Sequence, residues 1–224
     1  MKNKILFTVF FLYAISFFSC AGRNYSRYIP IPDGDFLGPE VMFDFGNITG
    51  TRDGVSGFNM PEWLFAYING GNREIERMFS FSGKYAFVGF SEGNNLSAMT
   101  RWAENFSAER DFSILAATRI ERRLINAAAL YPDDEYGAFF ERMVKTAYGT
   151  RYSGAVKEDT YWITVNYGST PSETYVFFVL LSIDRTQMQA VVSNMISESV
   201  AAVTLTRTQH NSINRLRNNF FEGF

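Results

Sequence analysis

Apolar and polar positions follow a helical period over several stretches of the chain. The clearest pattern is residues 134–147, where the apolar residues recur at i, i+3, i+4, i+7, i+8 and i+11: Tyr136, Phe139, Phe140, Met143, Val144 and Ala147. Weaker matches predict helices at about 61–70, 96–130 and 185–203, with another turn at 72–79. Asp133-Asp134 and Asp184 stand where carboxylates satisfy the free N–H groups of a helix start.

Three other stretches are rich in aromatic and β-branched residues, which favours strands at 84–90, 161–167 and 174–183. The last is almost continuously apolar, and the Gly168–Ser172 turn with Pro171 predicts an antiparallel hairpin. Because runs of helices and strands mix without a βαβ repeat, we expect an α+β fold, with a small antiparallel sheet of about three strands covered by long helices.

The first nineteen residues have the pattern of an export signal. Lys2 and Lys4 precede an apolar run from Ile5 to Phe18. A run of about 14 residues is too short to span a bilayer, which needs about 20. Its length, flanks and position indicate a secretory signal peptide at 1–19.

Cys20 follows this signal directly. The segment Phe17-Phe18-Ser19-Cys20-Ala21-Gly22 resembles a lipobox, in which the thiol is acylated and the preceding bond is cut, although Phe17 stands where Leu is common. Relaxed lipoboxes of this kind occur in spirochaetes. The sequence therefore predicts palmitate-type lipidation of Cys20. The alternatives are an ordinary signal peptide with an incidental cysteine and an uncleaved anchor.

The density of proline and glycine separates an N-terminal segment from the rest of the chain. They recur so often in residues 20–58 that we expect a lipidated arm or linker there, and residues 59–224 are expected to form one domain. The single cysteine excludes an internal disulfide. Loss of Lys2 and Lys4 would take the formal charge from −2 to about −4, and no basic face indicates nucleic-acid binding.

Candidate chemistry is sparse. His210, the only histidine, lies in a polar stretch, and Asp133-Asp134-Glu135 lacks calcium-loop spacing. Ser91-Glu92-Gly93 lacks the glycines and lysine of a phosphate loop. Arg119, Arg122 and Arg123 could bind an anionic head group, but a solvated helix face explains them without a ligand. We therefore predict no catalytic, cofactor-binding or metal site, and expect the three tryptophans to pack in the core: Trp63, Trp102 and Trp162.

Several short motifs resemble those of a known family: Cys20, Met60–Trp63, Ala116–Ile120, Trp162-Ile163 and Leu180–Asp184. With these motifs the chain is similar, over about 58–200, to the lipoprotein-20 type of bacterial envelope lipoprotein and the N-terminal module of the flagellar assembly protein T. It is also similar to lipoproteins of treponeme-type spirochaetes. The resemblance implies an outer-envelope domain of helices and sheet and supplies no functional residues; the 20–58 arm and the 134–147 helix depart from it.

These observations favour a non-enzymatic envelope lipoprotein, membrane-anchored through Cys20, whose domain binds a protein partner in the envelope or periplasm. Ala21 is not an inner-membrane retention signal, so the outer membrane is expected. The alternative is a carrier for a lipid or small apolar ligand, with a cavity lined by Phe139, Phe140, Phe177 and Val192.

Overall fold

A computed structural model describes residues 48–54, 60–129, 137–167 and 173–202, with individual positions between 204 and 224. The predicted signal peptide at 1–19, Cys20 and most of the 20–58 arm lie outside the described residues. So do Asp133-Asp134-Glu135, Tyr136, and the Gly168–Ser172 turn.

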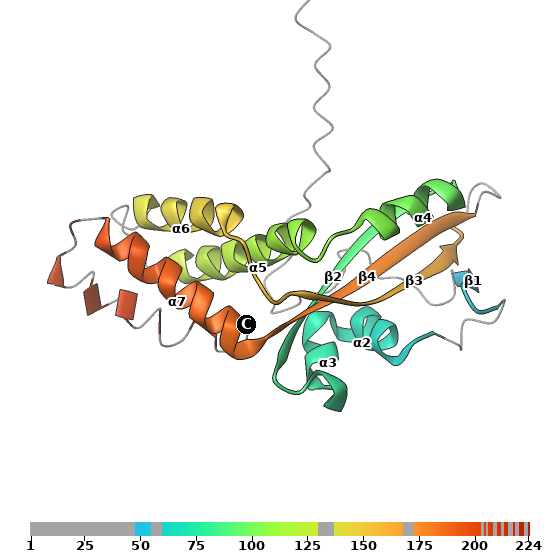
Figure 1. The fold of residues 1–224 in the computed structure, drawn as a ribbon, viewed down its shortest axis with the longest axis horizontal. Coiled ribbons are helices and arrows are strands. Elements are labelled where there is room, and N and C mark those ends of the chain that lie inside the picture. The colour runs from blue at the N-terminus through green and yellow to red at the C-terminus, as the bar shows by residue number, and fades with distance from the viewer. Residues whose placement is uncertain are drawn as a thin grey trace, which may run out of the picture. The chain divides into compact units, whose positions relative to one another are not determined.

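The fold is α+β, as expected, and the described residues form a sheet of four antiparallel strands (Figure 1). The strands are β1 (Ile48–Thr51), β2 (Lys84–Gly93), β3 (Val156–Val165) and β4 (Thr174–Asp184), in the order β1-β3-β4-β2. β3 and β4 pair antiparallel as predicted, with Trp162 opposite Phe177. β1 was not expected: these four residues lie within the predicted arm, yet they pair with β3 at the sheet edge.

Alternating residues of each strand serve two separate cores. In β2, Tyr85 and Phe87 face one hydrophobic cluster, whereas Ala86 and Val88 face the other. The central strand β4 is buried on both faces from Val176 to Ile183, which explains its almost continuous apolar sequence.

Two short helices and a 3₁₀ turn cover one face: α2 (Glu62–Gly70), α3 (Asn72–Arg77) and η2 (Phe79–Phe81). The predicted apolar side of α2 is buried, and Gly71, at φ 70°, follows its end. Phe81 of η2 and Ile75 of α3 join the same core. The helical turn expected at 72–79 is thus a helix followed by a tighter turn.

On the other side, α4 (Leu96–Asn105), α5 (Arg110–Ala129) and α7 (Arg185–Ala201) contact the sheet, and α6 (Gly137–Gly149) packs on α5 and α7. The single helix expected at 96–130 is therefore two helices. Ser107 breaks it, because its hydroxyl accepts from the N–H groups of Glu109 and Arg110 and its own N–H donates to Asp111.

The clearest predicted face is confirmed. In α6, Phe139, Met143 and Ala147 are buried in the helix-covered core, with Phe140 and Val144 packed at its border. α6 contacts both α5 and α7, and these three helices lie together at one end of the sheet (Figure 1).

α7 begins as predicted. The Asp184 carboxylate accepts from the N–H groups of Thr186 and Gln187. None of the helices in the described part of the chain is long and apolar enough to cross a membrane.

Candidate functional site

Glu76 and Arg119 form a buried ion pair at the free side of strand β2. Nη1 of Arg119 lies 2.8 Å from Oε1 of Glu76, and the two side chains are 3% and 6% exposed. The same carboxylate accepts from the Ala86 N–H at 3.0 Å, and Nη1 of Arg119 also donates to the Ala86 carbonyl at 3.2 Å. The pair therefore satisfies backbone groups that an edge strand would otherwise leave open.

This burial overturns the prediction for Arg119. A solvated helix face was expected, whereas Arg122 and Arg123 are only partly exposed and Arg119 is enclosed. The buried side of α5 is wide, because the helix packs on both the sheet and α6. Arg119 falls inside that side, between Ala116 and Ile120.

Aromatic rings surround the Arg119 guanidinium. Its central carbon lies 5.4 Å from the Tyr85 ring centre, 5.1 Å from Phe87 and 4.5 Å from Phe224. Among the described residues, no hydrogen-bond partner is found for its Nε and Nη2. The faces of the rings attract the cation and offset part of the missing hydrogen bonding.

A surface hollow of about 290 Å³ lies on the solvent side of this pair, between the η2 turn and the start of α7. Figure 1 shows α3 next to the place where β4 runs into α7. The hollow is lined by Glu76, Arg77, Met78, Phe79, Ser82, Gly83 and Arg185. Gly83 has a positive φ of 79° and its carbonyl accepts from the Arg185 N–H at 2.9 Å, which fixes the two walls together.

Arginines supply the accessible charge of the hollow. Arg185 donates through Nε to the Lys84 carbonyl at 3.1 Å and lies over the Tyr85 ring. No carboxylate partner of Arg185 is found among the described residues. Arg77 is exposed and pairs with Glu74. Glu76, the acid in the lining, is neutralised internally by Arg119.

Lys84 and Glu158 form a second polar group nearby, across strand β4. Nζ of Lys84 lies 2.7 Å from Oε1 of Glu158, and the buried Ser182 hydroxyl donates to the same oxygen. Partial burial raises the pKa of Glu158, but the hydrogen bonds from Lys84 and Ser182 and the Lys84 charge outweigh it, so the pKa lies below its ordinary value. These groups hold three strands together.

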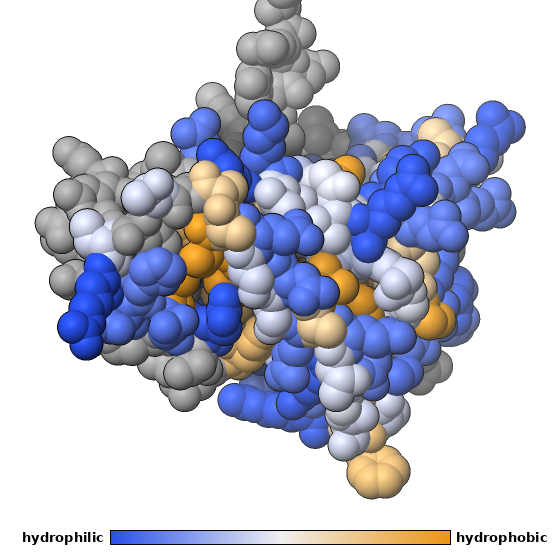
Figure 2. All heavy atoms as spheres, turned by 60° about the vertical axis from the view of Figure 1, so that its left-hand side comes forward, coloured by the Kyte–Doolittle hydropathy of each residue, from blue (hydrophilic) through white to orange (hydrophobic). Residues whose placement is uncertain are grey.

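Phe79 projects from the rim of the hollow and is 97% exposed. Single exposed apolar side chains are common on proteins. Figure 2 shows one side of the molecule, where hydrophobic residues appear in small areas among hydrophilic ones. Phe79 is far more exposed than usual, since the other large exposed apolar residues described are at most 60% exposed.

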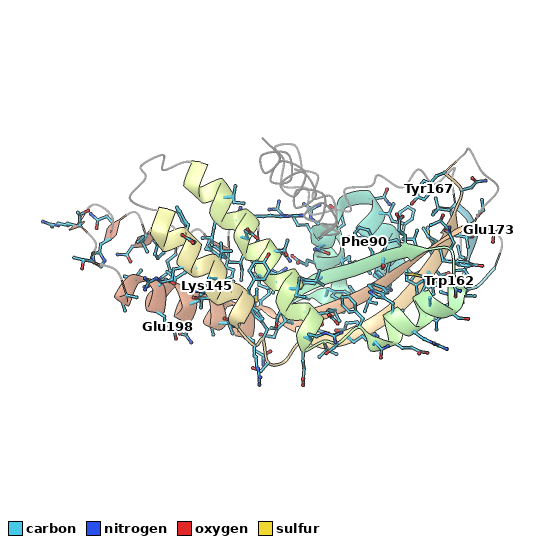
Figure 3. The ribbon with its side chains drawn as sticks, turned by 90° about the horizontal axis from the view of Figure 1, so that it is seen from above. Phe90, Lys145, Trp162, Tyr167, Glu173 and Glu198 are labelled. Atoms are coloured by element: carbon cyan, nitrogen blue, oxygen red, sulfur yellow. The ribbon has the colours of Figure 1, made fainter. Side chains whose placement is uncertain are left out.

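The far end of the sheet carries a separate aromatic group (Figure 3). The hydroxyl of Tyr167, after β3, donates to Oε2 of Glu92 in β2 at 3.1 Å. Partial burial and the Glu92 charge raise the pKa of Tyr167 to about 12, so this phenol stays protonated at neutral pH. Phe90 in β2 is partly exposed at the same end, and its ring contacts Phe178.

The remaining sequence candidates are dispersed. His210 is exposed, and Ser91–Gly93 belongs to strand β2 instead of a loop. Trp63 is buried and donates to Asp159 at 2.8 Å, while Trp102 and Trp162 are partly buried. Within the described ranges, no group of three His, Cys, Asp or Glu side chains could hold a metal ion.

Sequence reasoning missed the residues of the hollow. The signal present was the run Arg77-Met-Phe-Ser-Phe-Ser-Gly-Lys84, in which cations flank aromatic and small polar residues. Comparison with protein-family models, with curated proteins and with solved structures finds no match to this chain.

Proposed function

We propose that this chain is a non-enzymatic lipoprotein of the bacterial cell envelope, held on the outer membrane by lipid on Cys20. Its α+β domain acts as a structural or interaction module. The observation that carries the proposal is the position of the chain's one cysteine, directly after an export signal and inside a lipobox-like segment. Two or more acyl chains on one residue suffice for stable anchoring.

The polar contacts of the domain support a non-enzymatic role. The buried carboxylate of Glu76 and the hydroxyl of Ser182 are each engaged in bonds that join elements of the fold. Catalysis needs a reactive group with access to substrate. Both residues are buried and bonded to structural partners, so they are suited to stabilising the fold.

Labelling in cells tests the anchor. Wild-type chain should incorporate labelled palmitate and fractionate with membranes. Cys20→Ser should incorporate none, and should remain unprocessed or leave the lipid-bearing fraction. Ser193→Ala, a comparably small change on helix α7, is the control and should label like wild type. Palmitate uptake by Cys20→Ser would overturn the proposal.

A carrier of lipid or small apolar ligands is the second candidate. The residues predicted to line its cavity lie together: Phe139, Phe177 and Val192, from three elements, are buried in a single cluster with Phe140 at its border. Saturable binding of a fluorescent fatty acid, lost in Phe139→Trp, would favour this candidate. Binding that is unchanged in that variant would exclude the proposed lining.

A further inference from the structure

Resting on the proposed membrane anchoring, we infer that the η2 turn is a bilayer-docking tip. In this inference Phe79 inserts among lipid chains, and the hollow beside it takes an anionic phospholipid head group through Arg185 and Arg77. The segment that joins Cys20 to the domain does not by itself determine which side of the domain faces the membrane. The 28 residues from Cys20 to Ile48 could span up to about 90 Å when extended, so any side of the domain could reach the membrane.

The turn presents Phe79 rigidly. Phe81 is buried in the sheet core and Met78 packs against it, so both neighbours hold the turn down. The N–H of Phe81 donates to the Met78 carbonyl at 3.0 Å, and that of Ser82 to Phe79 at 3.1 Å. Phe79 therefore cannot fold back onto the core without breaking this turn, and its ring stays available to an apolar environment.

Charge at the base of the turn complements an anionic surface. Arg77 and Arg185 line the hollow, and Lys84 follows the turn. Of the nearby acids, Glu76 is enclosed with Arg119, Glu74 pairs with Arg77 and Glu158 pairs with Lys84, while the exposed Asp184 caps α7. Arg185 is left as the cation of the hollow for which no carboxylate partner is found among the described residues. Basic side chains close to an anionic leaflet are attracted to it, and the attraction weakens with added salt.

A single projecting ring suits a bilayer better than a protein partner. Protein-binding aromatics are usually surrounded by contacts that exclude water from the interface. Here Ser80 and Ser82 of the same turn are exposed and polar, whereas Met78 and Phe81 pack on the core, so little apolar area surrounds Phe79. An isolated apolar side chain between small polar residues and cations can enter the interface of a membrane without such surroundings.

The test uses the full lipidated chain in proteoliposomes, with a polarity-sensitive fluorophore on Ser80→Cys. Phosphatidylcholine vesicles are compared with vesicles that also contain phosphatidylglycerol. We expect blue-shifted emission and loss of iodide quenching in the phosphatidylglycerol vesicles. Both effects should disappear in Phe79→Ser, weaken in Arg185→Gln and Arg77→Gln, and reverse in high salt. The same probe on Ile125→Cys, exposed on α5, should not change.

The experiment distinguishes a failure of the anchoring proposal from a failure of the docking-tip inference. If the wild-type chain itself takes up the thiol reagent, Cys20 carries no lipid and the anchoring proposal fails. If wild type resists the reagent and floats with the vesicles, but the probe at position 80 stays water-exposed, the chain is anchored and the docking tip is wrong. A shift equal in both vesicle types and unchanged in the arginine variants would overturn the head-group site.

Discussion

Glu76 of α3 and Arg119 of α5 meet around the edge of strand β2, although they are 43 positions apart in sequence. α3 packs on one face of the sheet and α5 on the other. The ion pair, with Ala86 between its partners, therefore links the two helix layers. It is the contact that most directly joins the two cores and one wall of the hollow.

Removing the Arg119 cation should lower the free energy of unfolding substantially. Arg119→Met leaves the Glu76 carboxylate buried without its countercharge, which typically costs about 3–5 kcal/mol of unfolding free energy. The double variant Glu76→Gln/Arg119→Met keeps an acceptor for the Ala86 N–H and removes both charges, so it should be more stable than Arg119→Met alone. Urea unfolding measures both. Arg77→Met, at an exposed pair, should cost less than about 1 kcal/mol; equal losses for Arg77→Met and Arg119→Met would contradict the buried pair.

The buried face of α6 predicts a graded series of stability losses when its residues are truncated. Phe139 is fully buried, Phe140 packs at the border of the core, and Glu141 is exposed. Phe139→Ala should lose about 3–5 kcal/mol through lost burial and a cavity. Phe140→Ala should lose less, and Glu141→Ala should hardly change the melting temperature. A Phe140→Ala variant that melts normally but loses a binding partner would instead identify this residue as an interaction surface.

Gly89 of β2 is required by its neighbour. A Cβ atom there would lie 2.3 Å from Cζ of the Phe106 ring, too close for any contact. Gly89→Ala should therefore destabilise the domain by about 1–3 kcal/mol through overpacking. Phe106→Leu should restore much of that loss in the double variant. Additive losses in calorimetry would show that the two sites do not touch.

The Lys84–Glu158 pair gives the domain an acid-sensitive contribution. Because the pKa of Glu158 is lowered on folding, its stabilisation is present above its ordinary value of 4.5 and fades as the pH falls through the lower folded value. Lys84→Met should thus destabilise at neutral pH, and its difference from wild type should narrow in acid below about pH 4.5. Lys145→Met removes the same charge from α6 and should leave that acid dependence unchanged.

Local signals predicted much of this fold. The period of Phe139, Met143 and Ala147, the apolar run of β4 and the Asp184 cap are all properties of neighbouring residues, and each is observed. The break at Ser107 was missed because apolar residues continue at helical spacing beyond it, while the capping hydrogen bonds that begin the next helix leave no periodic trace.

Contacts between residues far apart in the sequence could not be predicted from local signals. β1 contains Gly50 and two threonines and shows no apolar alternation, so only its pairing with β3 makes it a strand. Arg119 resembles a surface residue until Glu76 and the surrounding rings are brought to it by the fold. The hollow likewise depends on Arg185 meeting the η2 turn, a contact across about a hundred residues.

The central claim is that Cys20 is the first residue of the mature protein and carries lipid. Mass spectrometry of the N-terminal peptide from membranes of the producing cell tests it most directly. The account predicts a peptide that begins at Cys20, increased in mass by a diacylglyceryl group on sulfur and, where the cell adds it, an acyl group on the amine. A mature chain that begins at another residue, or an unmodified Cys20, would contradict it.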